Sequence, residues 1–132
     1  MLKGLGADKR YWQSLVEGHV ELPRCADCRR WHWPAPFRCG DCGSWDMDWT
    51  PVELDGRIFT WTRTWHPFGG TENLGMPFVP VLVELPAAGG IRLLGLLEGK
   101  DEPQIGGRVT GRIDSTKAFD RTIPSLRWAA AA

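Results

Sequence analysis

The sequence predicts a mainly β fold, in which an N-terminal helix and a four-cysteine zinc ribbon precede a five-stranded barrel. Two observations carry most of this prediction. The four cysteines form two C-x-x-C pairs, Cys25 with Cys28 and Cys39 with Cys42. From residue 58 onwards, short stretches of alternating apolar and polar residues are separated by turn-forming residues, which is typical of a small barrel such as the OB-fold.

The two cysteine pairs predict a tetrahedral metal site with Cys25, Cys28, Cys39 and Cys42 as its ligands. Ten residues separate the pairs and no cysteine is left over, which is typical of structural zinc. Four protein ligands leave no position for water, so the metal is expected to hold the fold and do no chemistry. His32 is read as a surface or packing residue, because the cysteines already satisfy the metal.

Other chemistries for these cysteines have less support. Two disulfides need an oxidising compartment, and residues 1–6 contain no apolar segment of a secretory signal. A redox-active C-x-x-C is normally a single pair beside a βαβ pattern. Iron binds the same four ligands in rubredoxin-like sites, so the sequence leaves zinc and iron as alternatives.

The charge balance predicts a soluble, cytoplasmic protein without a nucleic-acid partner. The 132 residues include 16 Lys plus Arg and 16 Asp plus Glu. Binding to a phosphate backbone usually requires a basic excess, which this chain lacks. No stretch approaches the roughly 18 apolar residues that a membrane-spanning helix needs, so no membrane association is expected.

Residues 8–18 are predicted to form a short helix. Asp8 can cap its start and Gly18 can end it. Tyr11, Trp12, Leu15 and Val16 are expected on one face. A helix of about three turns is marginal alone, so this face must dock on the chain itself or on a partner.

Residues 19–49 are predicted to form the metal ribbon. Residues 19–24 lead into the first cysteine pair as a strand, and residues 31–33 follow as the return strand. Some thirty residues cannot bury a sufficient core, so the metal must supply stability. The expected organisation is a helical segment at 1–18, the ribbon at 19–49 and the barrel domain at 50–132.

Five strands are predicted in the barrel. The third is apolar on both faces, and the others are short. The second places Val81, Val83 and Leu85 on one face, and residues 86–90 form the turn that follows it. In the first, Phe59, Trp61 and Trp65 are expected to share a face. The predicted strands are residues 58–65, 78–85, 91–98, 108–114 and 126–128, and residues 129–132 are expected to fray.

Two long loops, residues 66–77 and 115–125, are predicted to be functional or mobile. The first carries an unusual number of apolar side chains for a solvated loop, and the region around the second has a local basic excess. The tryptophans of the helix and ribbon either fill the two small cores or, where they are exposed, favour an interface. The predicted partner or ligand contacts are Trp12, Trp31, Trp33, His66, Phe68, Leu74, Met76, Arg112, Lys117 and Arg121.

The ordered motifs resemble those of the DUF35 family, acyl-CoA-associated proteins with a rubredoxin-like zinc ribbon and an OB-fold. The resemblance runs from about Tyr11 to Trp128, and the four cysteines match the metal positions of the family. The chain departs from the family pattern at Arg29, where a glycine often follows the second ligand. The matching stretches are Tyr11-Trp12, Glu17-Gly18 and residues 22–28, 36–44, 56–62 and 77–85.

The resemblance implies an accessory role. Proteins of this family look like partners of thiolase-superfamily enzymes, including thiolases and retro-aldolases of steroid side-chain degradation, and they also accompany MaoC-like hydratases. By this resemblance, the partner supplies the catalytic groups, and the chain stabilises it in a hetero-oligomer and helps form the acyl-CoA site. No catalytic residue is therefore predicted here.

Two other functions compete with this one. Zinc ribbons and OB-folds both serve in single-stranded nucleic-acid binding, and aromatic residues can stack on bases. The neutral charge balance argues against this alternative. A rubredoxin-like electron carrier would require iron in the four-cysteine site.

Overall fold

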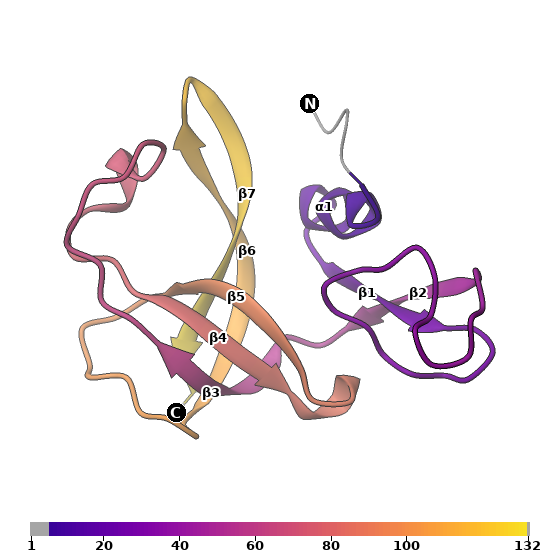
Figure 1. Cartoon of the computed structure of the whole chain (residues 1–132). Coiled ribbons are helices and arrows are strands. Elements are labelled where there is room, and N and C mark those ends of the chain that lie inside the picture. The colour runs from indigo at the N-terminus through magenta and orange to yellow at the C-terminus, as the bar shows by residue number, and fades with distance from the viewer. Residues whose placement is uncertain (1–5, 132) are drawn as a thin grey trace.

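The computed structural model describes residues 6–131 and consists of a small helical and ribbon lobe beside a closed barrel (Figure 1). No helix among these residues is long and apolar enough to cross a membrane. In chain order the elements are α1 (Lys9–Val16), β1 (Val20–Cys25), β2 (Met47–Val52), β3 (Asp55–Trp61), η1 (Glu72–Leu74), β4 (Pro80–Leu85), η2 (Pro86–Ala88), β5 (Ile91–Leu97), β6 (Arg108–Ala118) and β7 (Arg121–Ala130).

The predicted helix is present, with one difference on its apolar face. Tyr11 and Leu15 are buried, as expected, and the third buried residue of the helix is Ser14. Val16 is exposed, so the face of the helix that packs on the rest of the chain is narrower than predicted. Asp8 occupies the N-cap position but its carboxylate caps no backbone N–H. It accepts a hydrogen bond from Trp12 Nε1 at 3.1 Å instead.

The ribbon contains a two-stranded sheet whose second strand differs from the prediction. Residues 31–33 form only an isolated bridge, between Trp31 and Arg24. The strand that pairs with β1 is β2, which runs antiparallel from Cys25↔Met47 to Val20↔Val52. Both cysteine turns therefore lie in the connection between β1 and β2. Because β2 runs from residue 47 to 52, the sheet spans the boundary expected at 49/50, which stays a prediction.

The five remaining strands close into a barrel in the order β3-β4-β5-β7-β6. Neighbouring strands are antiparallel except β5 and β7, which are parallel, and this is the strand order of an OB-fold. Two strands are longer than predicted. Residues 115–125 are not a loop, because β6 and β7 continue as a paired hairpin to Ala118 and Arg121. Residues 129 and 130 are paired in β7, and Ala131 N–H donates to Arg108 O at 2.9 Å.

The faces of β3 also differ from the prediction. Ile58 is buried, whereas Phe59 and Trp65 are exposed. The register with β4 shifts between Ile58 and Thr60. Such a bulge inserts an extra residue and exchanges the inward and outward faces beyond it. Simple alternation from residue 58 to residue 65 therefore placed Phe59 on the wrong face, whereas Trp61, beyond the bulge, packs against the core.

The barrel is filled around Trp128, which is completely buried. Its ring lies against Gly95 and Gly111, where an added Cβ would come within 2.7 and 2.9 Å of the indole. The two strand glycines therefore make room for this side chain. Buried residues of the ribbon lobe, including Tyr11 and Leu22, belong to the same apolar cluster as the barrel core.

The ribbon meets the barrel where Trp31 covers the β4–β5 turn. A Cβ added at Gly89 would lie 2.9 Å from Trp31 Cδ1, and Gly89 itself adopts a left-handed conformation with φ +66°. Trp33 packs on the shared core nearby. The turn therefore requires glycine for both its backbone and its contact with the ribbon.

We predict that Gly89→Ala destabilises the protein more than Gly90→Ala. Both residues have positive φ, but a Cβ at Gly90 would meet only Glu84 Oε1, at 3.7 Å. Gly90→Ala should cost about 1 kcal/mol of backbone strain. Gly89→Ala should cost about 2–3 kcal/mol, because it also displaces Trp31. Urea denaturation measures the difference, and equal losses for both variants would contradict the Trp31 contact.

Candidate metal centre and partner surface

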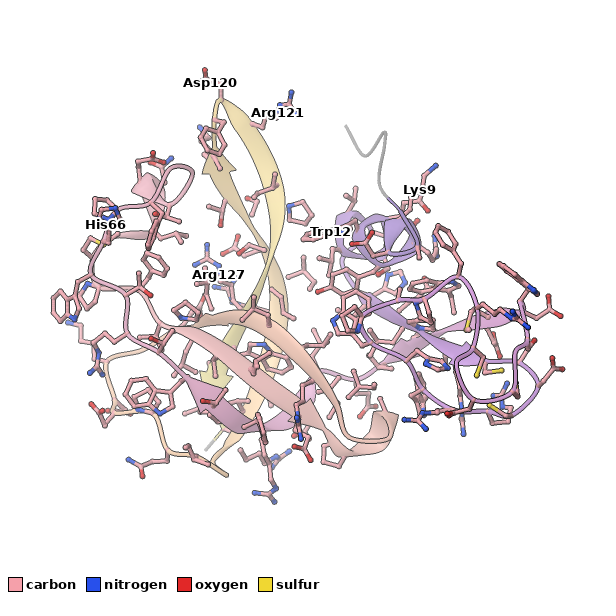
Figure 2. All side chains as sticks on the ribbon, viewed as in Figure 1. Lys9, Trp12, His66, Asp120, Arg121 and Arg127 are labelled. Carbon is pink, nitrogen blue, oxygen red and sulfur yellow. The ribbon has the colours of Figure 1, made fainter. Side chains whose placement is uncertain are left out.

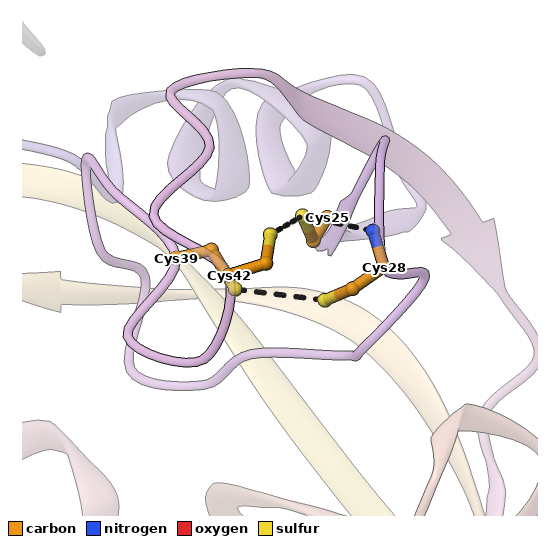
Figure 3. A group of neighbouring side chains, drawn as sticks. All are labelled: Cys25, Cys28, Cys39 and Cys42. Carbon is orange, nitrogen blue, oxygen red and sulfur yellow. Dashed lines mark hydrogen bonds between the residues drawn. The ribbon is translucent and has the colours of Figure 1, made fainter.

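The four cysteines converge at one end of the two-stranded sheet (Figure 3). Their sulfur atoms all lie within 4.8 Å of one another. Cys25 Sγ is 3.5 Å from Cys42 Sγ, and Cys28 Sγ is 3.6 Å from Cys39 Sγ. A tetrahedral ion with metal–sulfur bonds of about 2.3 Å places its sulfurs about 3.8 Å apart, and a disulfide would hold them near 2.05 Å. The geometry fits a four-thiolate metal site.

The two cysteine turns, here called the first and second knuckle, have the same backbone hydrogen bonds. Cys25 N–H donates to Arg30 O and Cys39 N–H donates to Ser44 O, both at 2.8 Å. The residue four positions after each first cysteine donates back to that cysteine's carbonyl, at 2.9 Å from Arg29 and 3.0 Å from Gly43. Each turn thus holds its cysteines rigidly enough to present both sulfurs to one ion.

The side chains around the knuckles repeat as well. Arg24 Nε donates to Arg29 O at 2.6 Å, and Arg38 Nε donates to Gly43 O at 2.8 Å. Each guanidinium also lies over a tryptophan, 5.0 Å from the Trp31 ring and 5.5 Å from the Trp45 ring. The sequence signal is a pattern, R-C-x-D-C-x-x-W, that begins at Arg24 and again at Arg38. The cysteine spacing alone did not reveal it.

Arg29 stands where the family often has a glycine, and its backbone adopts the conformation that a glycine would adopt there. Arg29 adopts φ +67°, the left-handed conformation that Gly43 adopts at the same place in the second knuckle with φ +79°. A non-glycine residue there costs about 1 kcal/mol. The first knuckle keeps the same geometry, so the substitution does not disturb the ligands.

His32, expected as a surface or packing residue near the metal site, contacts one of the four cysteines. Its Nε2 is 3.3 Å from Cys39 Sγ, so the imidazole can donate a hydrogen bond to that sulfur. Backbone N–H groups act in the same sense on Cys25, where those of Cys28 and then Asp27 lower the pKa of the thiol to about 6. Such donors stabilise the thiolate form that a metal requires. Burial and the neighbouring thiols raise the pKa of Cys28 and Cys42 instead, so these two sulfurs need the positive charge of a metal to ionise.

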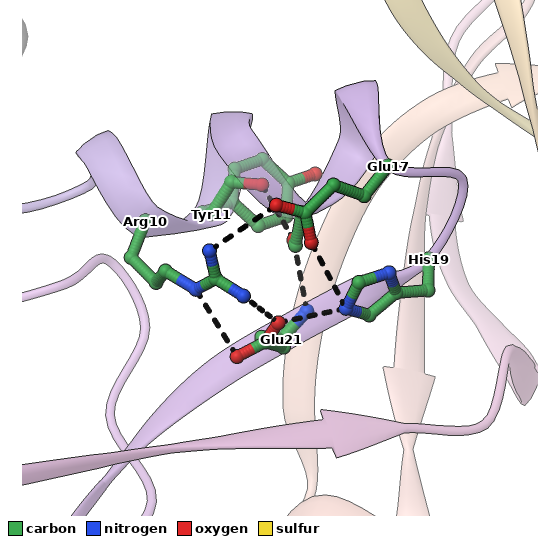
Figure 4. Close-up of polar contacts among 6 residues, drawn as sticks. Arg10, Tyr11, Glu17, His19 and Glu21 are labelled. Carbon is green, nitrogen blue, oxygen red and sulfur yellow. Dashed lines mark hydrogen bonds and ion pairs between the residues drawn. The ribbon is translucent and has the colours of Figure 1, made fainter.

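A polar cluster fixes α1 on β1 (Figure 4). Glu21 is almost completely buried and accepts hydrogen bonds from Arg10 through both carboxylate oxygens. His19 Nε2 lies 2.7 Å from Glu21 Oε2 and 3.9 Å from Glu17 Oε2. Glu17, His19 and Glu21 are close enough to share a metal ion. The guanidinium of Arg10 already neutralises Glu21, so we read the cluster as an ion-pair network.

The 66–77 loop lies beside the outer end of the β6–β7 hairpin (Figure 1), whereas His66, at the start of the loop, lies farther from the tip (Figure 2). Phe119, at the tip, lies against Gly69 and Gly70 of the 66–77 loop. Asn73 Nδ2 donates to Lys117 O at 2.9 Å. His66 packs edge-on against Phe68, with ring centroids 4.5 Å apart. We name the side chains of Phe68, Leu74, Met76, Lys117, Phe119 and Arg121 the tip surface.

Sequence reasoning missed Phe119, which is 73% exposed. Phe119 lies in the turn between β6 and β7, and it was missed because this hairpin was not predicted from the sequence. Phe119 and Asp120 both have positive φ, 49° and 61°. This combination is that of a type I′ turn, where Asn and Gly are preferred over a bulky residue.

The other predicted contacts lie elsewhere. Arg112 is on the barrel wall, where it pairs with Asp114 at 2.9 Å and with Glu98. Within residues 6–131, neither Lys117 nor Arg121 pairs with a carboxylate. Trp12, Trp31 and Trp33 are half-buried against the shared core. Their packing within the chain leaves their role as partner contacts a prediction.

Comparisons with solved structures cover nearly the whole chain. A chain of the Ltp2–ChsH2(DUF35) aldolase superposes with a TM-score of 0.80 at 26% sequence identity, covering 98% of this chain and 98% of that chain. A DUF35-family protein of unknown function from Sulfolobus solfataricus superposes with a TM-score of 0.58 at 19% identity, over 95% of this chain and 85% of that chain. The second likeness concerns the fold alone.

Comparisons of the sequence cover less. A family model described as the ChsH2 rubredoxin-like zinc ribbon domain matches residues 12–48. A probable enoyl-CoA hydratase alpha subunit from Thermomonospora curvata is 30% identical over 105 residues, which is 77% of this chain. This chain spans only 32% of that protein's length, so the hydratase activity in its name does not transfer through the match.

We predict that the contribution of Glu21 to stability depends on pH. The hydrogen bond from Arg10, and then that from His19, lowers the pKa of the Glu21 carboxyl. A lowered folded-state pKa stabilises the fold above the unfolded pKa of about 4.3, and this stability is lost as pH falls through the folded value. Glu21→Gln should therefore unfold at lower urea than wild type at pH 7, and the gap should narrow below about pH 4.

Loss of metal in acid affects both proteins, so only their difference reports on Glu21. Glu17→Gln is the matched control, because Glu17 is exposed and lies at the edge of the same cluster. A gap between wild type and Glu21→Gln that is the same at pH 7 and pH 3.5 would contradict the assignment.

Proposed function

We propose that this chain, which belongs to the DUF35 family of zinc-ribbon and OB-fold proteins, is a non-catalytic accessory subunit of a thiolase-like enzyme that acts on acyl-CoA in the cytoplasm. In this role it stabilises a thiolase or a steroid side-chain retro-aldolase and helps form the acyl-CoA site. The observation that carries the proposal is the whole-chain match to the DUF35 aldolase structure.

The chemistry of the chain supports an accessory role. The four thiolates fill a tetrahedral metal, which leaves no open position for a substrate. The three histidines lie apart: His19 contacts Glu21, His32 contacts Cys39 and His66 packs on Phe68. Only the His32 contact joins a possible base to a possible nucleophile, and Cys39 is one of the four predicted metal ligands, so its thiolate is not free for nucleophilic catalysis.

We further propose that the metal is zinc. The thiolate set suits both zinc and iron, and the matching family model is described as a zinc ribbon. Elemental analysis should find one zinc per chain in a colourless protein. Removal of the metal by a chelator should unfold the knuckles, because the ribbon has little core of its own. A red protein containing iron would contradict the assignment and favour an electron carrier.

The tip surface is the proposed contact with the enzyme. It combines exposed apolar side chains with Lys117 and Arg121 at its rim, which is the composition of a protein interface rather than of a solvated loop. Phe119 supports this reading most strongly. A bulky residue in a left-handed turn costs about 1–2 kcal/mol, and backbone strain of this kind gathers at functional sites.

The outer face of the barrel gives less support to nucleic-acid binding. OB-folds bind oligonucleotides on the face of their second and third strands, which here are β4 and β5. That face carries Leu82 and Leu94, and its Arg92 lies over Phe59 and pairs with Glu84 at 3.5 Å. Base binding would favour free aromatic rings and unpaired cations there.

The proposal predicts that the tagged chain co-purifies with the thiolase-like enzyme encoded beside it. Phe119→Asn should weaken this complex at least about 30-fold, the loss expected of an interface hot spot. The free variant should melt at the same temperature as wild type or higher, because Asn accepts the left-handed conformation. Ile105→Ser is the control, since Ile105 is 71% exposed on the β5–β6 connection, away from the hairpin tip in Figure 1.

A neighbouring enzyme that is soluble, monodisperse and fully active without this chain would contradict the accessory role. Wild-type affinity in Phe119→Asn would contradict only the tip surface. A labelled single-stranded oligonucleotide that binds in a salt-dependent manner would favour the nucleic-acid alternative.

A further inference from the structure

The two knuckles are alike in sequence and geometry but differ in what covers them. Trp31 of the first knuckle lies on Gly89 of the barrel, and Pro23, two residues before the first cysteine, is completely buried. The equivalent positions of the second knuckle are Trp45 and Phe37. These side chains are 69% and 68% exposed.

The exposed surface of the second knuckle is already ordered. Arg38 is held by its hydrogen bond to Gly43 O and lies over the Trp45 ring, as Arg24 lies over Trp31 in the covered knuckle. An ordered aromatic side chain loses little conformational entropy on binding. We name the side chains of Phe37, Arg38 and Trp45 the second-knuckle surface.

The covered knuckle shows what such a surface accepts. The indole of Trp31 approaches the backbone of Gly89 so closely that no Cβ fits between them. The left-handed conformation of Gly89, φ +66°, presents that backbone at a tight turn. A tryptophan supported by an arginine thus packs directly on a glycine-containing turn in this chain.

A groove beside the second-knuckle surface adds a preference for charge. Its volume is about 440 Å³, and it lies between α1 and the second knuckle, next to Phe37 and Trp45. The charged side chains that line it are Lys9 and Arg10, and no carboxylate of the described chain lines it. Because Arg10 pairs with Glu21 and Glu17, Lys9 supplies the positive charge that is available to a partner. Such a groove favours a segment that carries negative charge.

We infer that the second-knuckle surface docks a glycine-containing turn with an acidic flank from a partner protein subunit, in the way that the first knuckle docks the β4–β5 turn of this chain. The inference rests on the proposed accessory function and gives the partner enzyme a second contact, separate from the tip surface. The docked segment is a folded turn, because Trp31, the equivalent residue of the first knuckle, packs on a turn and not on an extended strand.

The test compares Trp45→Ser with Trp31→Ser in the complex with the neighbouring enzyme. Trp45→Ser should weaken the complex at least about 10-fold and leave the melting temperature and metal content of the free chain unchanged. Trp31→Ser should lower the melting temperature, because its ring packs within the chain. Lys9→Glu, which alters the groove without touching the knuckle, should weaken binding about 3- to 10-fold. Ile105→Ser should bind as wild type does.

Several results would overturn the inference. Trp45→Ser that binds within twofold of wild type would remove the surface while leaving the accessory role intact. An equal loss in Ile105→Ser would show a nonspecific effect. A wild-type dimer that Trp45→Ser dissociates, measured by sedimentation of the chain alone, would identify the occupant as a second copy. Failure of wild type to bind the enzyme at all would remove the proposed function and this inference together.

Discussion

The four-thiolate centre is the constraint on which the ribbon depends. A segment of some thirty residues buries too little apolar surface to fold alone. Sulfur atoms 3.5 and 3.6 Å apart across the two knuckles repel one another as thiolates unless a cation lies among them. The metal thus orders the knuckles, and the knuckles then present Trp31 to the barrel. The fold of the ribbon and its position on the barrel therefore share one cause.

The barrel depends on a different constraint, the packing of Trp128. Its indole fills the interior between Gly95 and Gly111, and residues of α1 and β1 extend the same apolar cluster. The ion-pair network of Arg10, His19 and Glu21 holds the helix in place on its polar side. Because the core is continuous between the lobes, α1 and β1 are held in place on the barrel.

Local patterns predicted the parts of the fold that local physics decides. The cysteine spacing located the metal site, and alternation located β4, whose inward residues are completely buried. The outer half of the β6–β7 hairpin was missed because its buried residues, Thr116 and Ala118, are polar or small, so no apolar alternation marks it. The pairing of β2 with β1 was missed because it joins residues more than twenty positions apart. The knuckle repeat was visible in the sequence, but its meaning required knowing which copy the barrel covers.

The contact between Trp31 and Gly89 also bears on how such a chain can be recombined. A ribbon is short, is marked by its cysteines and looks like an exchangeable module. Its tryptophan, Trp31, nevertheless packs on Gly89, which lies 58 residues downstream in a turn of the barrel. A chimera that combines a ribbon from another protein with this barrel, without the matching β4–β5 turn, would lack a compatible contact between the two parts. The ribbon and that turn must therefore be exchanged together, although they are far apart in the sequence.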